Sequence, residues 1–343
     1  MSDLRADTEA HAEAINALAD GAHSTPFSIL GVHKAGQVRI VRTLQPQAQA
    51  VSLIDGTGKV LAPMERVHER GIFAAKMPPR LRRYRYRIEL PGGDTYDCED
   101  PYRFPTSLGE VDLYLLGEGS HRNIHRALGA HCVELLGVKG TRFAVWAPNA
   151  SRVSVVGSFN DWDGRRHVMR LHPANGIWEI FLPDVGPGDL YKFELLDQSG
   201  KRLPIKSDPL AHYFEPPPGN ASVVYESRYS WSDDAWLAQR SGDPDLDRPV
   251  SIYEVHGGSW QRKADEDNRW LTYRELADTL IPYVREMGFT QIELLPITED
   301  PFDGSWGYQP IGMYAPTWRF GEPDDFRHFV DRCHLAGIGV IID

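Results

Sequence analysis

The sequence predicts a multi-domain chain of 343 residues, in which two tandem antiparallel β-sandwiches precede a parallel β-α-β-α-β segment. Two observations predict this class. A set of short motifs occurs twice at an offset of about 100 residues, which indicates a duplicated domain. Near residue 250 the spacing of apolar residues changes from alternation, typical of strands, to a mixture of short apolar runs and helical spacing.

The duplication defines the two sandwiches, at residues 25–118 and 119–225. Both copies consist of short alternating runs punctuated by Gly, Pro and Asn, which is the pattern of antiparallel sandwiches. A duplication that serves packing alone would leave the same pattern. The repeated motifs are Leu30-Gly31-Val32-His33 with Leu128-Gly129-Ala130-His131, Gly71-Ile72-Phe73 with Gly176-Ile177-Trp178, Tyr86–Leu90 with Tyr191–Leu195, and Asp100-Pro101 with Asp208-Pro209.

Two further segments flank the sandwiches. Residues 1–24 form an Ala-rich N-terminal lead that is expected to be helical or disordered. Residues 226–249 are rich in Ser, Asp, Arg and Pro, including Ser241-Gly242-Asp243-Pro244, and are expected to form a linker.

Residues 250–343 alternate strands and helices, which predicts parallel strands joined by right-handed crossovers. Thr272 and Glu275 form a capping box for the first helix, whose inward face would hold Leu276, Leu280, Val284 and Met287. Pro282 lies inside this helix and should kink it. The expected order is strand 251–255, a helix from Thr272 to Gly288, strand 291–295, a long loop 297–321, a helix from Pro323 to Gly337 and strand 338–343.

The last strand is an apolar run, Val340-Ile341-Ile342, at the end of the sequence. A buried parallel strand normally has neighbours on both sides, so we expect the chain to be a fragment of a longer protein. The alternative is a small complete domain with three strands.

Composition excludes several classes of function. The net charge of −11 argues against nucleic acid as a partner. Cys98, Cys132 and Cys333 lack the spacing of a disulfide framework or zinc site, and the histidines lack metal-ligand spacing, so we expect no metal and no cofactor. There is no signal-peptide pattern and no apolar run long enough for a membrane span. A cytoplasmic location is therefore expected.

Candidate binding residues follow the strands of residues 250–343, because ligands bind at the carboxyl ends of parallel strands. The loop after the second strand contains Trp306, Tyr308 and Gln309. A flat aromatic ring beside an amide suits a sugar, whose C–H face stacks while its hydroxyls form hydrogen bonds. Alternatively, the two aromatic side chains only fill the end of the sheet.

Several further motifs occur in order along the chain, namely Ser251–His256, Glu293–Pro296, Ser305–Pro310, Tyr314–Pro316, Val340–Asp343, Phe159–Gly164 and Gly176–Glu179. Together these motifs resemble the branching enzymes of the alpha-amylase family. The resemblance implies that residues 250–343 are the first three β/α units of an incomplete (β/α)8 TIM barrel. It also implies that the sandwiches are a branching-enzyme N-terminal domain and a carbohydrate-binding-type module.

By this resemblance the reaction is a retaining glycosyl transfer from an α-1,4-glucan to a 6-hydroxyl, which makes α-1,6 branches. The catalytic Asp nucleophile and the acid/base Glu of the family follow later strands, so none is expected in this chain, which should be inactive alone. Tyr308 would stack on the sugar and Asp343 would bond to it, with Trp306 and Gln309 beside them. Glu254, Glu293, Glu299 and Asp303 are expected to be structural or solvated charges.

In the second sandwich the resemblance implies that Trp162, Lys192 and Asn220 contact glucan. Trp162 could instead cover an edge of the sheet. The expected partner is an α-1,4-glucan such as glycogen, and protein partners are not predicted. Two other functions remain open, namely a non-catalytic glucan-binding protein and a debranching or trehalose-releasing hydrolase of the same family.

Overall fold

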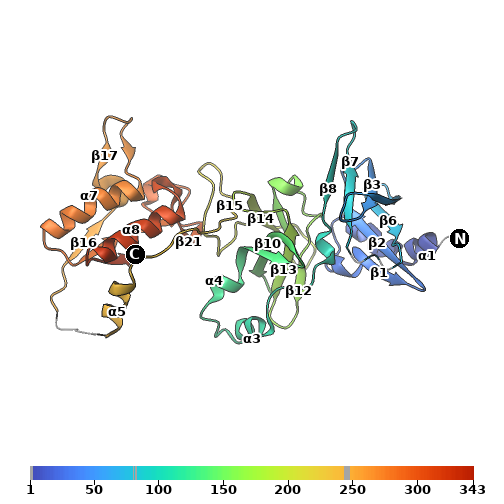
Figure 1. Ribbon diagram of the computed structural model, residues 1–343, viewed down its shortest axis with the longest axis horizontal. Helices are drawn as coiled ribbons and strands as arrows, with labels where there is room; N and C mark the ends of the chain where they lie inside the picture. Colours follow the sequence, from blue (N-terminus) through green and yellow to red (C-terminus); the bar gives the residue numbers. More distant parts are fainter. Residues whose placement is uncertain (1–2, 80, 82, 243–247) are drawn as a thin grey trace. The chain divides into compact units, whose positions relative to one another are not determined.

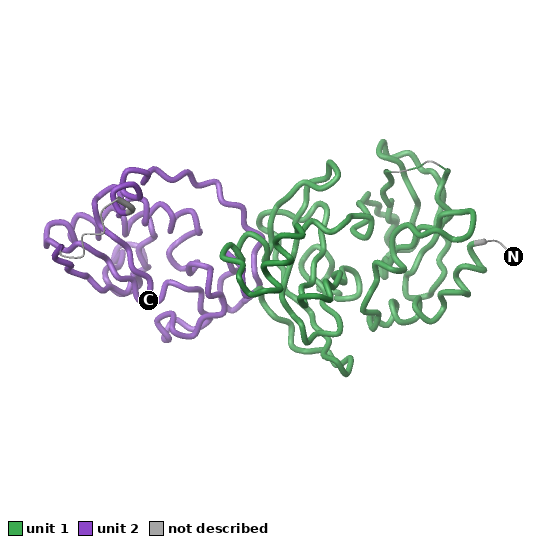
Figure 2. Tube along the Cα trace, turned by 90° about the horizontal axis from the view of Figure 1, so that it is seen from below, with its two compact units in different colours: residues 1–208 green, residues 209–343 purple. Residues whose placement is uncertain are grey.

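The structure is a computed structural model that describes residues 3–79, 81, 83–242 and 248–343. The chain divides into two compact units, Met1–Asp208 and Pro209–Asp343 (Figures 1 and 2).

The N-terminal lead is helical in its described part, with α1 at Asp3–Ala10 and α2 at Ala12–Ala19. Ile15 and Leu18 of α2 are buried in one apolar cluster with Leu44 and Ile72 of the first sandwich. These contacts explain why a short helix is held here, since an isolated helix of this length is marginal in water.

The first sandwich packs two four-stranded sheets face to face, in the orders β1-β2-β6-β5 and β4-β3-β7-β8. Val41 and Phe73 of the first sheet share a buried cluster with Leu53 and Tyr86 of the second. The alternation of the sequence thus produces two inward faces, as expected. The strands are β1 Gly31–Ala35, β2 Val38–Leu44, β3 Ala50–Ile54, β4 Val60–Pro63, β5 Glu65–His68, β6 Ile72–Lys76, β7 Arg85–Glu89 and β8 Thr95–Cys98.

The second sandwich follows helices α3 (Glu110–Glu118) and α4 (Ile124–Ala127). One sheet has the order β12-β13-β10-β9, and in the other β11 pairs antiparallel with β14. Phe143 and Tyr191, from the two sheets, meet with ring centroids 4.9 Å apart in the core. The strands are β9 Gly129–Leu135, β10 Val138–Trp146, β11 Arg152–Gly157, β12 Arg170–His172, β13 Ile177–Pro183 and β14 Leu190–Leu196. Two tandem sandwiches are therefore confirmed.

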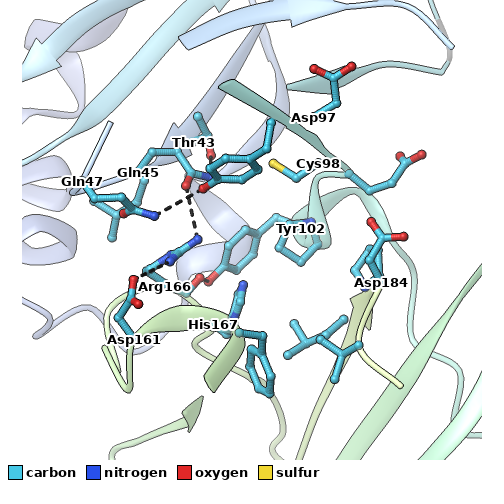
Figure 3. A pocket seen from close by; sticks show the side chains of 18 of the residues that line it. Thr43, Gln45, Gln47, Asp97, Cys98, Tyr102, Asp161, Arg166, His167 and Asp184 are labelled. Atoms are coloured by element: carbon cyan, nitrogen blue, oxygen red, sulfur yellow. Dashed lines mark hydrogen bonds and ion pairs between the residues drawn. The ribbon is translucent and has the colours of Figure 1, made fainter. Parts of the chain in front are cut away.

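A cavity of about 380 Å³ lies where the two sandwiches meet within the first unit (Figure 3). Gln45 and Tyr102 line it from the first sandwich and Arg166 and Asp184 from the second. Tyr102 closes part of its wall, because its hydroxyl donates to the carbonyl of Arg166 and accepts from the amide of Val168.

In the second unit, β16 (Ile252–Val255), β19 (Gln291–Leu294) and β22 (Gly339–Ile342) form a parallel sheet in that order. Helices α7 (Tyr273–Glu286) and α8 (Pro323–Leu335) connect the strands, as the sequence predicts. The capping box forms as expected, and α7 includes Pro282. Met287 was predicted to face inward, but α7 ends before it and its side chain is 58% exposed.

The segment expected to be a linker makes specific contacts with α8. The hydroxyls of Tyr229 and Ser232 both donate to Asp331, each at 2.6 Å, and His334 bonds to Asp233 at 2.6 Å. Helix α5 (Asp234–Gly242) follows, and strand β15 (Ser222–Val223) precedes these residues. Asp243 and Pro244 of the predicted linker motif lie outside the described residues.

Candidate functional site

The carboxyl ends of the three parallel strands carry the candidate site of the second unit. Asp343 directly follows β22, and the Tyr308 hydroxyl donates a 2.7 Å hydrogen bond to its carboxylate. This bond raises the pKa of Tyr308, with smaller contributions from burial and from the negative charges of Asp343, Glu254 and Glu293. The ring itself stays accessible, since Tyr308 is 57% exposed. The structure therefore joins two residues that the sequence proposed separately.

Trp306 forms a second exposed ring in the same loop. It stacks on His256, which follows β16, with ring centroids 5.5 Å apart and 25° between the planes. A 3₁₀ turn at Asp303–Ser305 ends with Trp306 in the left-handed conformation, at φ 56°. The opposite face of the indole remains available, because Trp306 is 55% exposed. Gln309 is exposed in the same loop.

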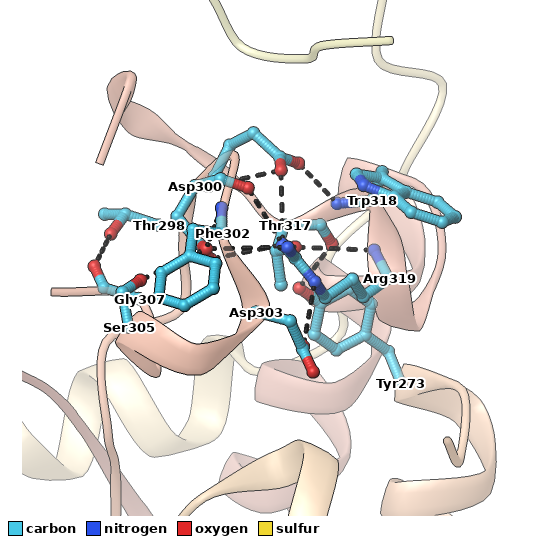
Figure 4. A network of polar contacts seen from close by, with 11 residues as sticks. Tyr273, Thr298, Asp300, Phe302, Asp303, Ser305, Gly307, Thr317, Trp318 and Arg319 are labelled. Atoms are coloured by element: carbon cyan, nitrogen blue, oxygen red, sulfur yellow. Dashed lines mark hydrogen bonds and ion pairs between the residues drawn. The ribbon is translucent and has the colours of Figure 1, made fainter. Parts of the chain in front are cut away.

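A buried polar network holds this loop in place (Figure 4). The guanidinium of Arg319 contacts Glu299 at 3.4 Å, Asp300 at 3.1 Å and Asp303 at 3.3 Å. The backbone amide of Trp318 donates to Glu299 at 2.8 Å. Because one cation bridges three carboxylates, the two ends of the loop are fixed relative to each other.

Of the two alternatives that the sequence left open for Glu299, a structural or a solvated charge, the structure supports the structural one. Its side chain is 1% exposed, and burial raises its pKa to about 7 in spite of the amide of Trp318 and the charge of Arg319. Strand β20 (Thr298–Glu299) pairs with β21 (Gly312–Pro316), which places Glu299 beneath the aromatic loop rather than at its surface. Glu299 is therefore a structural group of the loop.

The cavity under the aromatic loop is too small for a sugar. Its volume is about 20 Å³, and its lining includes His256, Trp306, Asp300 and Arg319. A ligand at this edge of the sheet would therefore lie on the exposed rings of Trp306 and Tyr308. Such an arrangement can stack on a sugar face and hydrogen-bond its hydroxyls through Asp343.

The carboxylates on the strands of this sheet form a separate group. Glu254 of β16 and Glu293 of β19 lie opposite each other in the parallel register. Both carry negative charge near the Tyr308 hydroxyl. Neither makes the kind of bridge that Arg319 makes to Glu299 in the described structure. These two carboxylates therefore lie near the exposed ring of Tyr308 and are not part of the buried network around Arg319.

In the second sandwich, the turn after β11 presents Trp162. Buried Asn160 organises this turn, since its side chain accepts from the amide of Gly157 and donates to the carbonyl of Val155, both at 2.9 Å. Asp161 and Trp162 both adopt the left-handed conformation. Trp162 is 37% exposed as a result. Asn160 and the two positive-φ residues explain how this short turn exposes an indole.

Lys192 lies close to the base of the same turn. It pairs with Val156 in the register of β11 and β14, one residue from Gly157, whose carbonyl accepts from the amide of Trp162. Asn220 belongs to the other compact unit, where its backbone amide donates to Glu215. The structure thus brings Trp162 and Lys192 to one end of β11, whereas it does not relate Asn220 to them.

Sequence reasoning missed His256 and Arg319, which orient the aromatic loop. The side chain of Arg319 is only 7% exposed. Its burial among three carboxylates identifies its role, and this burial is visible only in the structure. Among the described residues, no group of three or more potential ligands could hold a metal ion. No described helix is both long and apolar enough to cross a membrane.

Two family models match segments of the chain that lie almost entirely within the first unit. Residues 11–102 match the family described as alpha-1,4-glucan branching enzyme GlgB, N-terminal domain. Residues 127–211 match carbohydrate-binding module 48, also described as the isoamylase N-terminal domain. The two matches fall on the two sandwiches, and the second contains both Trp162 and Lys192 but not Asn220.

Curated relatives match almost the whole chain. The 1,4-alpha-glucan branching enzyme GlgB of Rhodospirillum rubrum is 54% identical over 98% of this chain and 46% of its own length. That of Rubrobacter xylanophilus is 53% identical over 96% of this chain and 45% of its own length. Among solved structures, a putative alpha amylase from Salmonella typhimurium aligns with a TM-score of 0.48 and 26% identity, covering 63% of this chain and 32% of that one.

The chain thus spans about half the length of the curated relatives that it matches. The sequence motifs, the two domain matches and the relatives agree, which confirms the resemblance inferred from the motifs. The chain is therefore similar to the N-terminal part of the 1,4-alpha-glucan branching enzymes, and its two sandwiches match the N-terminal domain of that family and carbohydrate-binding module 48.

Proposed function

We propose that this chain is the N-terminal part of a branching enzyme, in which it holds an α-1,4-glucan while a segment of that glucan is transferred to a 6-hydroxyl. The observation that carries the proposal is the Tyr308–Asp343 hydrogen bond at the carboxyl edge of the parallel sheet. This bond places the exposed ring of Tyr308 next to a carboxylate that can accept hydrogen bonds. A neutral sugar needs both a ring on which to stack and an acceptor for its hydroxyls. Identity of 53–54% to branching enzymes over this region supports the same assignment.

The reaction that we propose for the whole protein is a retaining double displacement. A carboxylate would attack the anomeric carbon, and a second carboxylic acid would protonate the leaving oxygen and then activate the acceptor hydroxyl. We place both groups outside this chain. Glu299 and Asp300 support this placement, because they are buried and engaged by Arg319. The three parallel strands would then be the first units of a (β/α)8 barrel.

We also propose the domain limits and the binding residues of the two sandwiches. Residues 25–118 would form the N-terminal domain, 119–225 the glucan-binding module and 250–343 the start of the barrel. Trp162 would stack on glucan with Lys192 beside it, while Asn220 remains a candidate from sequence alone. Cys98, Cys132 and Cys333 form no disulfide in the described structure, which suits the cytoplasmic location that we propose.

The first test is to incubate the chain with amylose and to measure new α-1,6 linkages by debranching and chain-length analysis. We expect none, because the proposed nucleophile and acid/base lie outside the chain. Measurable branching would overturn that placement. The same chain should still bind maltoheptaose in calorimetric titrations.

The second test concerns Tyr308. Tyr308→Ala removes the ring and should weaken maltoheptaose binding at this site by about tenfold, as expected for the loss of one stacking surface. Tyr308→Phe keeps the ring but loses the bond to Asp343, and should have a smaller effect. Tyr314→Ala is the matched control, since Tyr314 of β21 is also 57% exposed. If Tyr308→Ala and Tyr314→Ala weaken maltoheptaose binding equally, Tyr308 is not a specific stacking surface for the sugar.

A further inference from the structure

The cavity where the two sandwiches meet has the size of a ligand site. Its volume of about 380 Å³ lies within the range of small-molecule pockets and is large enough for one or two glucose units. Its walls come from both copies of the duplicated fold, with Gln47 and Tyr96 from the first and Arg166 from the second. The cavity therefore exists only because the two sandwiches pack together.

Two contacts between polar side chains that line this cavity are weak. The Gln47 amide donates to the Tyr96 hydroxyl at 3.3 Å, and the Arg166 guanidinium donates to the Gln45 amide oxygen at 3.5 Å (Figure 3). Both distances are longer than a normal hydrogen bond. These donors and acceptors can therefore exchange their mutual contacts for stronger ones to ligand hydroxyls at small cost.

The charges around the cavity do not favour an anion. Arg166 is the cation among the lining residues, and Asp161 lies 3.7 Å from it. Asp97 also lines the cavity, but Arg87 binds its carboxylate through two hydrogen bonds at 2.7 and 2.8 Å. A phosphate would thus meet carboxylates as well as the partly neutralised guanidinium.

Two of the titratable groups that line the cavity, His167 and Cys98, are neutral at physiological pH. Burial lowers the pKa of His167 to about 3, and burial raises the pKa of Cys98 to about 12. Tyr96 adds an aromatic ring that is 37% exposed, and half-buried Phe159 adds another. The lining thus combines amides, a phenol and aromatic rings with Arg166 and the carboxylates of Asp97, Glu99, Asp161 and Asp184, and this mixture of polar and apolar groups matches the mixed surface of a sugar.

We propose that this cavity binds one or two glucose units of a neutral α-glucan, at a site separate from Trp162. The class of ligand, an α-glucan, rests on the proposed function. The position of the site rests on the cavity at the junction of the two sandwiches. Gln45 and Gln47 would bond hydroxyls, Arg166 would donate to ring or hydroxyl oxygens, and Tyr96 would cover an apolar sugar face. Trp162 does not line this cavity, so the two sites can be separated by substitution.

The experiment is hydrogen–deuterium exchange of the full 343-residue chain with maltotriose, in a Trp162→Ala background. We expect slower exchange in peptides covering residues 94–102 and 161–168. We expect this protection to disappear at the same sugar concentration in a variant that also carries Gln47→Ala and Tyr96→Ala. The dissociation constant at this site should rise by about tenfold or more, because two side-chain contacts are lost.

Two controls make the result specific. Gln198→Ala removes an exposed glutamine of the second sandwich that does not line the cavity, and should leave the protection unchanged. Thermal unfolding of each variant would identify a loss of folding. If Trp162→Ala alone abolishes all protection, or if inorganic phosphate protects these peptides and maltotriose does not, the proposal is wrong. Protection here together with absent binding at Tyr308 would instead contradict only the proposed function of the second unit.

Discussion

The two sandwiches make the same structural hydrogen bonds with the same repeated residues. The Tyr86 hydroxyl donates to Asp100 at 2.9 Å in the first copy, and the Tyr191 hydroxyl donates to Asp208 at 2.7 Å in the second. In each copy the histidine of the Leu-Gly-X-His motif bonds to the carbonyl of the leucine three residues earlier, at 2.8 Å. The repeated motifs thus mark contacts that build the sandwich rather than contacts to a ligand.

The copies differ in the loop that follows the third strand of each. After β3, Asp55 accepts hydrogen bonds from the amides of Thr57 and Lys59 and closes a short polar turn. After β11, the longer turn uses buried Asn160 and exposes Trp162. The comparison indicates that the duplicated framework provides stability, while the loop that diverged provides the candidate binding surface.

A second difference lies inside the framework, at the third residue of β6 and β13. The first copy has buried Ala74 at this position, and the second has Glu179, which is 3% exposed. Glu179 accepts from the amide of Ser107 at 2.6 Å and the amide of Leu108 at 3.2 Å, and bonds to His172 at 2.9 Å. This carboxylate therefore fixes the segment that connects the two copies.

The largest expected effect tests what the copies share. Gly71 and Gly176 have φ values of 91° and 71°, and an added Cβ would lie 2.5 Å from the carbonyl oxygen of Gln45 or 2.6 Å from Pro148. Each alanine substitution should cost about 3–4 kcal/mol of unfolding free energy, from overpacking and left-handed strain together. Urea denaturation measures both values.

Gly58→Ala is the control for this prediction. Gly58 also has a positive φ, at 85°, but its Cβ would lie at least 3.5 Å from the Arg87 side chain. Only conformational strain then applies, which costs about 1 kcal/mol. A similar loss in all three variants would show that close packing at Gly71 and Gly176 is not the shared constraint.

The next prediction replaces Glu179 by the alanine of the first copy. Glu179→Ala should cost about 2–3 kcal/mol, because the buried amides of Ser107 and Leu108 lose their acceptor. Burial alone would raise the pKa of Glu179, but hydrogen bonds from His172 and Ser107 lower it to about 2. A depressed pKa stabilises the fold above the unfolded-state value, and this contribution is lost as the pH falls from about 4.5 to about 2.

The pH dependence separates charge from shape at Glu179. The Glu179→Gln variant keeps one carbonyl oxygen that can accept a hydrogen bond. At pH 7 its unfolding free energy should therefore fall less than that of the Glu179→Ala variant. Both variants should lose less stability than the wild type between pH 4.5 and pH 2, as measured by urea midpoints at each pH. An unchanged slope across that range would exclude Glu179 as the titrating group.

Local patterns predicted the framework of this molecule, whereas long-range contacts determined the rest. Thr272 and Glu275 are three residues apart, and their reciprocal capping bonds form as predicted. The sequence left Glu299 open as a structural or a solvated charge, because Arg319, which binds it, lies twenty residues later in the sequence. Tyr229 lies in a predicted linker, yet its hydroxyl binds Asp331, 102 residues away. The composition of a polar segment is the same whether its side chains are solvated or bind residues far away in the sequence, so composition cannot distinguish the two cases.

The smallest expected effect on stability belongs to Trp162, the residue that most distinguishes the second copy. Trp162→Ala should change the unfolding free energy by less than about 0.5 kcal/mol, since the side chain is partly exposed and Asn160 supports the turn. Glycogen binding should nevertheless weaken by about tenfold, because one stacking ring is lost. Quenching of tryptophan fluorescence and affinity electrophoresis in glycogen measure the effect.

Trp146→Ala tests whether exposure alone accounts for that loss. Trp146 of β10 is 63% exposed, more than Trp162, but it lies in a strand and its indole donates to the carbonyl of Asn175. We expect less than a twofold change in glycogen binding for this variant, because we propose that the binding site is the turn that presents Trp162 and not any exposed indole. If Trp146→Ala weakens binding as much as Trp162→Ala, the contrast between the two copies does not locate the glucan site, and the sheet face around Trp146 becomes the better candidate.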